Sequence, residues 1–179
     1  RDMVYSVVKQ QYKTLKTEGN YNNNIGLPLT ILRLKDEEVM ILEMGMNHLN
    51  EMEELSRIAC PDISAITNVG TAHIGELGSR ENILKAKLEI VAGMSDGSTL
   101  VINGDNDMLS TVRFDNFKVV KVGVDCAAVF KAEKVILMDD HSEFTINYNG
   151  KVYQVVVPVP GNHFVLNALI AIAIGIKLD

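Results

Sequence analysis

The sequence predicts an α/β fold: a doubly wound, mostly parallel sheet flanked by helices, with a small antiparallel β appendage. Strand-like and helix-like segments alternate through the first 124 residues, and such alternation gives right-handed crossovers and a parallel sheet. After residue 125 the pattern changes to consecutive strand-like runs that contain Asn149-Gly150, a strong hairpin signal. We therefore expect one domain of 179 residues in three parts, namely residues 1–124, residues 125–160 and a closing helix over residues 161–179.

The N-terminal half opens with a helix, because apolar side chains recur at helical spacing from Met3. Further along, Pro28 is tolerable in the first turn of a helix. A continuous apolar run then predicts a strand buried on both faces. Asn50 and Glu53 have the spacing of a helix N-cap and its capping glutamate. The predicted ranges are Lys13–Lys16 (strand), Thr17–Asn24 (loop), Leu27–Leu34 (helix), Val39–Met44 (strand) and Asn50–Ala59 (helix).

The alternation continues through the middle of the chain, where Ser79 is placed to cap an amphipathic helix. The predicted ranges here are Ile63–Val69 (strand), Arg80–Met94 (helix), Ser98–Ile102 (strand), Asp105–Val112 (short helix) and Phe117–Val122 (strand). The appendage is predicted as strands Val129–Leu137, Glu143–Asn147 and Lys151–Val157, followed by the helix Phe164–Leu178.

Composition narrows the possible functions. The chain is 47% apolar and 22% charged, which excludes a disordered or collagen-like protein. Its net charge of −6 disfavours a nucleic-acid partner, which requires a basic field. The apolar run Ala168–Ile176 is too short to span a bilayer. Cys60 and Cys126 form no metal or redox motif, so we expect two reduced thiols in a cytoplasmic protein.

Both ends of the chain lack the usual helix boundaries. No Ser, Thr, Asp or Asn precedes Arg1 as a cap, and the last helix pattern stops at Asp179 without Gly or Pro. We therefore expect a piece of a longer polypeptide.

Candidate binding residues follow the predicted strands, because ligands of doubly wound sheets bind beyond the carboxyl ends of the strands. The first such loop contains Thr17 and, near a glycine, Asn20, Asn22 and Asn23. Uncharged amides suit a sugar- or phosphate-bearing ligand. The same residues are also common in solvated turns, so both interpretations stay open.

Glu43 comes at the end of the apolar run Val39–Met44. A buried acid at that place must be paired or bound to a cation, and strand-end acids hold Mg²⁺ at phosphoryl-transfer sites. Pairing with a neighbouring loop is the alternative. The loop after the following strand contains Asn68, Thr71 and His73. His73 could be a metal ligand or a general base, although loop histidines are often neither.

Two further candidates lie on helices. Lys87 is next to the apolar Leu88 and could lie on the sheet-facing side of its helix or at the border of that side. It is therefore either a site residue or part of a solvated face. His163 and Asn167 lie near Gly161 at the start of the closing helix, where free N–H groups suit a base or an anion, or serve simple capping. The chain contains no Gly-x-x-x-x-Gly-Lys-Ser/Thr loop, so an ATP enzyme would need that loop before Arg1.

Taken in order, these segments resemble the central, ATP-binding domain of the Mur ligases over nearly the whole chain. The most specific segment is VMILEMGMNHLNEMEELSRIACPDISAITNVGTAHIGELGSRENILKAKLEIV, because it joins three candidate sites at fixed spacing. The other segments are RDMVYSVVKQQYKTLKTEGNYNNNIGLPLT, LVINGDND and PGNHFVLNALIAIA. The resemblance implies a phosphate loop directly before Arg1, and N-terminal and C-terminal domains beyond this chain.

The resemblance also implies roles for three charged or titratable residues. Glu43 would bind the Mg²⁺ that bridges the ATP phosphates, and His73 would serve a second Mg²⁺. Lys87 matches a lysine that is carbamylated in several relatives. A carbamate is an anionic oxygen ligand, whereas an ammonium repels Mg²⁺.

The remaining roles concern substrate and nucleotide. By resemblance, the residues that face the muramoyl substrate are Thr17, Asn20, Asn22 and Asn23. Asn68 and Thr71 would line the reaction centre. His163 and Asn167 would belong to the adenine-binding stretch. The family usually has His-Asn in that stretch, whereas this chain has His163-Phe164. Phe164 cannot hydrogen-bond to the edge of a base.

The implied activity is ATP-dependent C–N bond formation in peptidoglycan precursor synthesis, with ATP as co-substrate and Mg²⁺ as cofactor. D-alanyl-D-alanine would be added to UDP-N-acetylmuramoyl-tripeptide through an acyl phosphate, by a monomeric enzyme of which this piece alone is inactive. The alternatives are another Mur ligase or a folylpolyglutamate-type ligase, a non-catalytic binding module, or a purely structural interaction domain.

Overall fold

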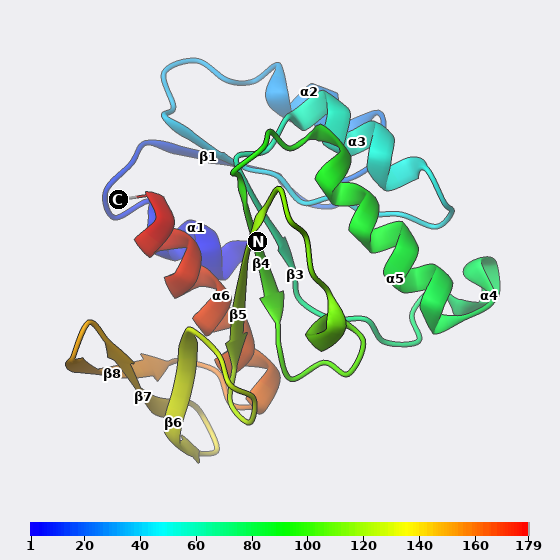
Figure 1. Cartoon of the computed structure of the whole chain (residues 1–179). Helices are drawn as coiled ribbons and strands as arrows, with labels where there is room; N and C mark the ends of the chain where they lie inside the picture. Colours follow the sequence, from blue (N-terminus) through cyan, green and yellow to red (C-terminus); the bar gives the residue numbers. More distant parts are fainter. Residues whose placement is uncertain (179) are drawn as a thin grey trace.

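The computed structural model describes residues 1–178, which form two β-sheets flanked by helices (Figure 1). The helices are α1 (Asp2–Val8), α2 (Gly26–Ile31), α3 (Glu51–Ala59), α4 (Ile74–Leu77), α5 (Arg80–Leu88) and α6 (Asn162–Leu178), with 3-10 turns η1 (Glu89–Gly93) and η2 (Leu109–Thr111). The strands are β1 (Thr14–Lys16), β2 (Val39–Ile41), β3 (Ile63–Ile66), β4 (Thr99–Asn103), β5 (Lys118–Gly123), β6 (Phe130–Leu137), β7 (Ser142–Tyr148) and β8 (Lys151–Val157).

Strand pairing confirms a parallel layer followed by an antiparallel appendage. The larger sheet has the order β3-β4-β5-β6-β7-β8, in which β3 to β6 pair in parallel and β6 to β8 pair in an antiparallel manner. Strands β1 and β2 form a separate parallel pair. The parallel part therefore consists of two sheets, where the sequence predicted one.

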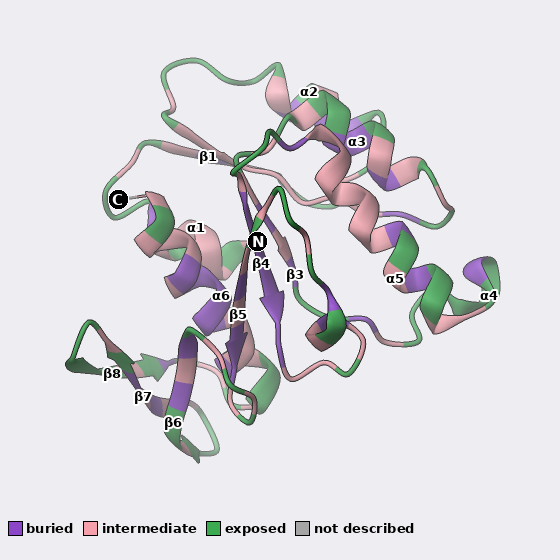
Figure 2. Cartoon of the chain, viewed as in Figure 1, coloured by how far each residue is buried: buried purple, intermediate pink, exposed green. Residues whose placement is uncertain are grey.

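The central strand β4 is buried along its whole length, because helices cover both faces of the sheet (Figure 2). Leu100 and Ile102 pack in one apolar cluster with Ile83 of α5. Val101 points to the opposite face and packs in a second cluster with Leu169 of α6. This alternation places α3 and α5 on one side and α1 and α6 on the other (Figure 1).

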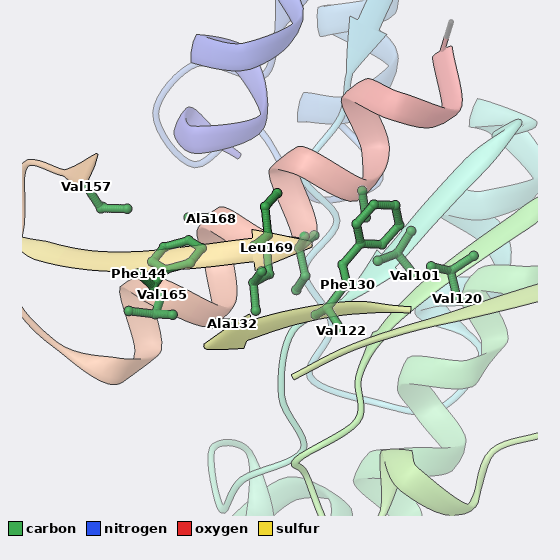
Figure 3. Packing of buried hydrophobic residues seen from close by; sticks show 13 residues of the cluster. Val101, Val120, Val122, Phe130, Ala132, Phe144, Val157, Val165, Ala168 and Leu169 are labelled. Carbon is green, nitrogen blue, oxygen red and sulfur yellow. The ribbon is translucent and has the colours of Figure 1, made fainter. Parts of the chain in front are cut away.

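The appendage shares the second cluster with the parallel strands. Figure 3 shows Phe130 and Phe144 of the appendage beside Leu169 and Val165 of α6. The β7–β8 turn has Asn149 at φ 51° and Gly150 at φ 77°, the left-handed conformations of a type I′ hairpin. The predicted hairpin is therefore confirmed.

Three local predictions were wrong. Asn50 has φ 71° and makes no side-chain cap; Glu51 instead accepts hydrogen bonds from the backbone N–H groups of Asn47 (2.7 Å) and His48 (3.2 Å). The apolar run Val39–Met44 yields a strand of three half-buried residues. The predicted short helix Asp105–Val112 is reduced to η2, at the start of which Asn106 Oδ1 accepts a hydrogen bond from the N–H of Leu109 (3.0 Å).

The predicted helix Arg80–Met94 has the expected cap, since the Ser79 hydroxyl accepts a hydrogen bond from the N–H of Asn82 (3.2 Å). Its α-helical part, however, ends at Leu88, and the chain tightens into η1. The N–H of Gly93 donates to Ser56 Oγ (3.0 Å), and a Cβ on Gly93 would lie 1.9 Å from the carbonyl oxygen of Ser56. This close approach to α3 sets the geometry of the last turns.

Within residues 1–178, no helix combines the length and apolar character that crossing a membrane requires.

Candidate active site

Glu43 stands just beyond the carboxyl end of β2, and its backbone is fixed by Thr17. The N–H of Thr17 donates to the carbonyl of Ile41 (3.0 Å), which continues the β1–β2 pairing by one residue. The side chain of Thr17 is completely buried, and its Oγ1 accepts a hydrogen bond from the N–H of Glu43 (2.9 Å). Thr17 therefore positions the carboxylate rather than presenting its own hydroxyl to solvent.

Asn22 holds the Glu43 carboxylate from the neighbouring loop. Its Nδ2 donates to Glu43 Oε1 (3.2 Å), and its carbonyl accepts from the N–H of Gly45 (2.8 Å). A Cβ at Gly45 would lie 3.0 Å from this same Nδ2, so glycine allows the two loops to approach. The amide that the sequence assigned to substrate is here part of the Glu43 support.

Arg1 adds a positive charge to the same edge. Its Nη1 donates to the carbonyl of Gly19 (2.7 Å) and lies 3.8 Å from Glu43 Oε2. The hydrogen bonds that Arg1 donates to the Asp2 carboxylate raise the pKa of Arg1, so the guanidinium stays charged. The Glu43 side chain nonetheless remains 41% exposed, which leaves its oxygens accessible to a ligand.

Lys87 and Glu43 line one cavity of about 600 Å³. Lys87 projects from α5 and is half-buried, and burial lowers its pKa. Across residues 1–178, no hydrogen bond or ion pair reaches its ammonium. Two of the three residues predicted to serve metal ions therefore border the same space.

His73 lies elsewhere in the loop after β3 and is not among the residues that line this cavity. It is exposed, has φ 65° and precedes α4. Thr71 is also exposed, and its carbonyl accepts from the N–H of Ile74 (3.1 Å). The arrangement leaves both side chains open to solvent.

Asn68 is connected to the loop after β4 by Asn106, whose Nδ2 donates to Asn68 Oδ1 (2.9 Å). Arg80 strengthens this junction, because it donates to the carbonyl of Val69 (2.8 Å) and forms an ion pair with Asp107 (2.6 Å). These loop-linking residues had no predicted role. The run of polar residues Asn103–Asp107 at the end of a strand was the feature of the sequence that could have indicated them.

Asp105 links the loop after β4 to the loop after β5. Its carboxylate accepts hydrogen bonds from the N–H groups of Val124 (2.6 Å) and Cys126 (2.8 Å). Burial alone would raise the pKa of Asp105, but these hydrogen bonds outweigh it and lower the pKa. Burial and the nearby Asp105 raise the pKa of Cys126 to about 11, so this thiol stays protonated at neutral pH.

The other two asparagines of the loop after β1, Asn20 and Asn23, differ in the hydrogen bonds that they make. Asn23 Oδ1 accepts from the N–H groups of Ile25 (3.2 Å) and Gly26 (2.8 Å) and so starts α2. Asn20 is exposed, and its carbonyl accepts from the N–H of Asn22 (2.7 Å). Both residues are exposed, but the side chain of Asn23 is engaged in starting α2, whereas no side-chain hydrogen bond of Asn20 is found within residues 1–178.

His163 and Asn167 lie four residues apart on α6, on one side of its first turns. The ring of His163 lies 4.0 Å from that of Phe164, centroid to centroid. Gly161 precedes the helix at φ 122°, a conformation that favours glycine. His163 is exposed and available to a planar ligand.

The chemistry of Glu43 fits a magnesium ion that is shared with a substrate. No three His, Cys, Asp or Glu side chains gather as a ready metal cage in residues 1–178. Mg²⁺, however, is commonly held by one or two carboxylates together with substrate phosphates and water. A single accessible carboxylate at a strand end therefore suffices for a protein ligand of this kind.

The fold and this site belong to the Mur ligase class of α/β domains. The profile of the Mur ligase middle domain matches residues 1–175, so the chain belongs to the Mur ligase family, as its middle domain.

Particular members of the family are similar over nearly the whole chain. The UDP-N-acetylmuramoyl-tripeptide–D-alanyl-D-alanine ligase of Bacillus subtilis (strain 168) is 39% identical over 176 residues, covering 98% of this chain and 38% of that protein. The crystal structure of MurF from Acinetobacter baumannii superposes with a TM-score of 0.92 at 29% identity, covering 99% of this chain and 39% of that one.

A second solved structure carries a nucleotide. The MurF ligase from Thermotoga maritima in complex with ADP gives a TM-score of 0.88 at 25% identity, covering 98% of this chain and 42% of that one. The chain thus spans between 38% and 42% of the length of each of these relatives.

Proposed function

We propose that this chain is the central domain of an ATP-dependent ligase that adds D-alanyl-D-alanine to UDP-N-acetylmuramoyl-tripeptide. The observation that carries the proposal is Glu43, an accessible carboxylate held at a strand end by Thr17 and Asn22. The names of the similar ligases supply the substrates. In this proposal residues 1–179 are one domain of a longer, monomeric, cytoplasmic protein, and they are inactive alone.

The reaction proposed is amide formation through an acyl phosphate. The terminal carboxylate of the tripeptide attacks the γ-phosphorus of ATP, and the bond from phosphorus to the bridging oxygen breaks to release ADP. The amine of D-alanyl-D-alanine then attacks the acyl carbon, loses a proton and expels phosphate. The main electrostatic obstacle is repulsion between the attacking carboxylate and the triphosphate, which a bound Mg²⁺ would reduce.

The residues of this chain would bind and orient the reactants. Glu43 would hold one Mg²⁺ and His73 a second. Lys87, whose ammonium is disfavoured by burial, would contribute after carbamylation, as an anionic oxygen ligand. The proposed metal ligands thus come from the segment after β2, the loop after β3, and α5.

The proposed substrate contacts lie in the loops. Asn20, Asn22 and Asn23 would face the muramoyl substrate. Thr17, which is buried, would act only through Glu43, whose backbone N–H it binds. Asn68 and Thr71 would line the reaction centre. For adenine the proposed residues are His163 and Asn167, with the ring of Phe164 offering a stacking surface in place of a hydrogen bond.

The first test changes the carboxylate in the full-length protein. We expect Glu43→Gln to lower kcat by at least about 100-fold, the scale of losing one electrostatic contact to the transition state, and to weaken the dependence on Mg²⁺. ADP formation measured with both substrates present is the readout. The matched control is Glu133→Gln, an exposed acid on β6, which should leave kcat unchanged. Unaltered Mg²⁺-dependent turnover in Glu43→Gln would remove the support for this site.

The second test separates the proposed ligase from its relatives. ADP should form only when tripeptide nucleotide and D-alanyl-D-alanine are both present. Equal turnover with a free amino acid as acceptor would indicate a sister Mur ligase, and turnover with a folate would indicate a folylpolyglutamate-type ligase. Measurable ADP release by residues 1–179 alone would contradict the inactivity proposed for the isolated domain.

A further inference from the structure

The loops after β3 and β4 are tied together by a side chain that is itself held in one orientation. Strands β3 and β4 are parallel neighbours, with Ile66 opposite Ile102, so both loops leave the same edge of the sheet (Figure 1). Asn106 in the second loop reaches Asn68 in the first, 38 positions away along the chain (2.9 Å). The orientation of these two amide groups decides what Asn68 can offer to a ligand.

Backbone contacts fix the orientation of the Asn106 amide. Its Oδ1 accepts a hydrogen bond from the N–H of Leu109 (3.0 Å), and its Nδ2 donates to the carbonyl of Val69 (3.2 Å). A backbone N–H can only donate, and a carbonyl oxygen can only accept. Turning the amide over would place Oδ1 against a carbonyl oxygen and Nδ2 against an N–H, so only one orientation satisfies both partners.

The fixed amide of Asn106 sets the orientation of the Asn68 amide in turn. Because Asn106 presents Nδ2 to Asn68, the facing atom has to be an acceptor, and it is Asn68 Oδ1 (2.9 Å). Asn68 is exposed, and within residues 1–178 its Nδ2 has no hydrogen-bond partner. Asn68 therefore turns its carbonyl oxygen inward and offers N–H donors to solvent.

The backbone next to this donor is held in place and leaves space for it. A Cβ on Gly70 would lie 3.1 Å from Asn68 Nδ2, closer than ordinary van der Waals contact. Val69 is completely buried, and its carbonyl also accepts a hydrogen bond from Arg80 (2.8 Å). Arg80 is in turn paired with Asp107 (2.6 Å). The donor thus stands on a braced loop, beside a position that carries no side chain.

The location and polarity of the donor point to an anionic ligand. Asn68 follows Thr67, which lines the same cavity as Glu43 and Lys87. Carboxylate and phosphoryl oxygens accept hydrogen bonds, and a preorganised N–H stabilises negative charge on such an oxygen. An amide that was free to turn would present its own carbonyl oxygen part of the time and would repel the same group.

We propose that Asn106 is a positioning residue that locks the Asn68 amide with its N–H donors toward an anionic oxygen of the reacting groups. The inference rests on the proposed function, in which Asn68 lines the reaction centre, and it adds the residue that sets the polarity of Asn68. The oxygen belongs either to the terminal carboxylate of the tripeptide or to the phosphoryl group transferred from ATP. Asn106 acts only through Asn68.

Two substitutions in the full-length protein remove the donor of Asn106 and keep an acceptor for the N–H of Leu109. Asn106→Asp preserves the shape, but its carboxylate attracts Asn68 Nδ2 and so inverts the Asn68 amide. Asn106→Ser leaves that amide free to rotate. We expect kcat for ADP formation to fall at least about 100-fold in Asn106→Asp, the scale of one lost oxyanion contact, and to fall less in Asn106→Ser. A raised KM for the tripeptide nucleotide would identify the carboxylate as the partner, and a raised KM for ATP would identify the phosphoryl group.

A double-mutant cycle separates positioning from a merely structural role. If Asn106 acts through Asn68, the variant that carries both Asn68→Ala and Asn106→Asp should have a kcat within about threefold of that of Asn68→Ala alone. The control is Asn116→Asp, which removes a similar amide donor, since Asn116 Nδ2 donates to Asp96 Oδ1 (3.1 Å). These two residues precede the amino ends of β5 and β4, at the opposite edge of the sheet, so kcat should be unchanged.

Hydrogen exchange of the side-chain amides, followed by NMR in the full-length wild type, reports the same polarity without an activity assay. The amide protons of Asn106 donate to two acceptors and should exchange at least about tenfold more slowly than those of Asn68. This measurement needs no variant, so it does not depend on whether Asn106→Asp folds.

Three results would overturn the proposal: equal kcat values for Asn106→Asp and the wild type, effects of the two substitutions that simply multiply in the double variant, or slower exchange at Asn68 than at Asn106. Failure of the proposed function would look different. The wild type itself would then form no ADP with tripeptide nucleotide and D-alanyl-D-alanine, whatever the exchange rates of the two amides.

Discussion

Thr17 illustrates how one buried hydroxyl organises the candidate site. Its Oγ1 is the partner of the Glu43 N–H, and its own N–H extends the β1–β2 pairing. The sequence showed Thr17 only as one of several polar residues in a loop. Its position beneath the carboxylate became apparent from tertiary contacts, which span 26 residues along the chain.

Replacing Thr17 by valine keeps the shape of the side chain and removes the acceptor. We expect Thr17→Val to lower the free energy of unfolding by about 1–3 kcal/mol, since the Glu43 N–H loses its partner in a buried setting. Urea denaturation monitored by circular dichroism measures this. The control is Thr111→Val, an exposed threonine, expected within about 0.5 kcal/mol of wild type. Equal stabilities for both variants would show that the hydroxyl contributes nothing to the fold.

The half-buried Lys87 should make the free energy of unfolding depend on pH in a direction that can be stated. Burial lowers its pKa from the ordinary value of 10.5, so the folded state binds its proton more weakly than the unfolded state. The unfavourable effect is fully present below the lowered pKa and disappears as the pH rises towards 10.5. We therefore expect Lys87→Met to raise the urea midpoint at pH 7 and to lose part of that advantage at alkaline pH.

The control for Lys87→Met is a substitution of another lysine on the same helix, α5. Lys85→Met changes an exposed lysine two residues away and should leave the urea midpoint near that of wild type at each pH. A Lys87→Met midpoint that lies below wild type at pH 7 would contradict the burial argument.

At the scale of elements, a turn or helix end could be predicted from the sequence when it depends on neighbouring residues, and could not when it depends on distant ones. The hairpin at Asn149-Gly150 and the Ser79 cap each depend on a few neighbouring residues, and both were predicted. The end of α5 and the start of α3 depend on distant partners. Glu89 binds the N–H of Asn50 across 39 positions (2.8 Å), and no local pattern reveals such a contact.

The close contact between Gly93 of η1 and Ser56 of α3 leaves no room for a side chain at position 93. A methyl group there would meet the Ser56 carbonyl oxygen at 1.9 Å, so α3 and η1 would have to separate. We expect Gly93→Ala to lower the free energy of unfolding by about 1–3 kcal/mol, the usual effect of overpacking. Gly75→Ala is the control, because Gly75 has open space around its Cβ position. Thermal unfolding of the two variants should differ clearly, and matching melting temperatures would mean that the contact relaxes freely.

At the scale of the whole molecule, the fold class was predictable because it depends on the order of elements. The division into two sheets was not, because strand pairing is non-local and β2 is too short to reveal its partners. The candidate site was predicted in part. Glu43 and Lys87 border one cavity, the role of His73 beside them stays a prediction, and the supporting residues Arg1, Asn106 and Asp105 were missed.

The apolar cluster shared by the parallel strands and the appendage has a consequence for the design of shortened variants of this protein. Val101 and Val120 from the parallel strands and Phe130 and Phe144 from the appendage pack against the same stretch of α6 (Figure 3). Deleting residues 125–160 would expose the apolar side chains of α6 that pack against the appendage, and such an exposed apolar patch favours aggregation. We therefore expect the three segments that the sequence distinguishes to fold together as one domain rather than separately.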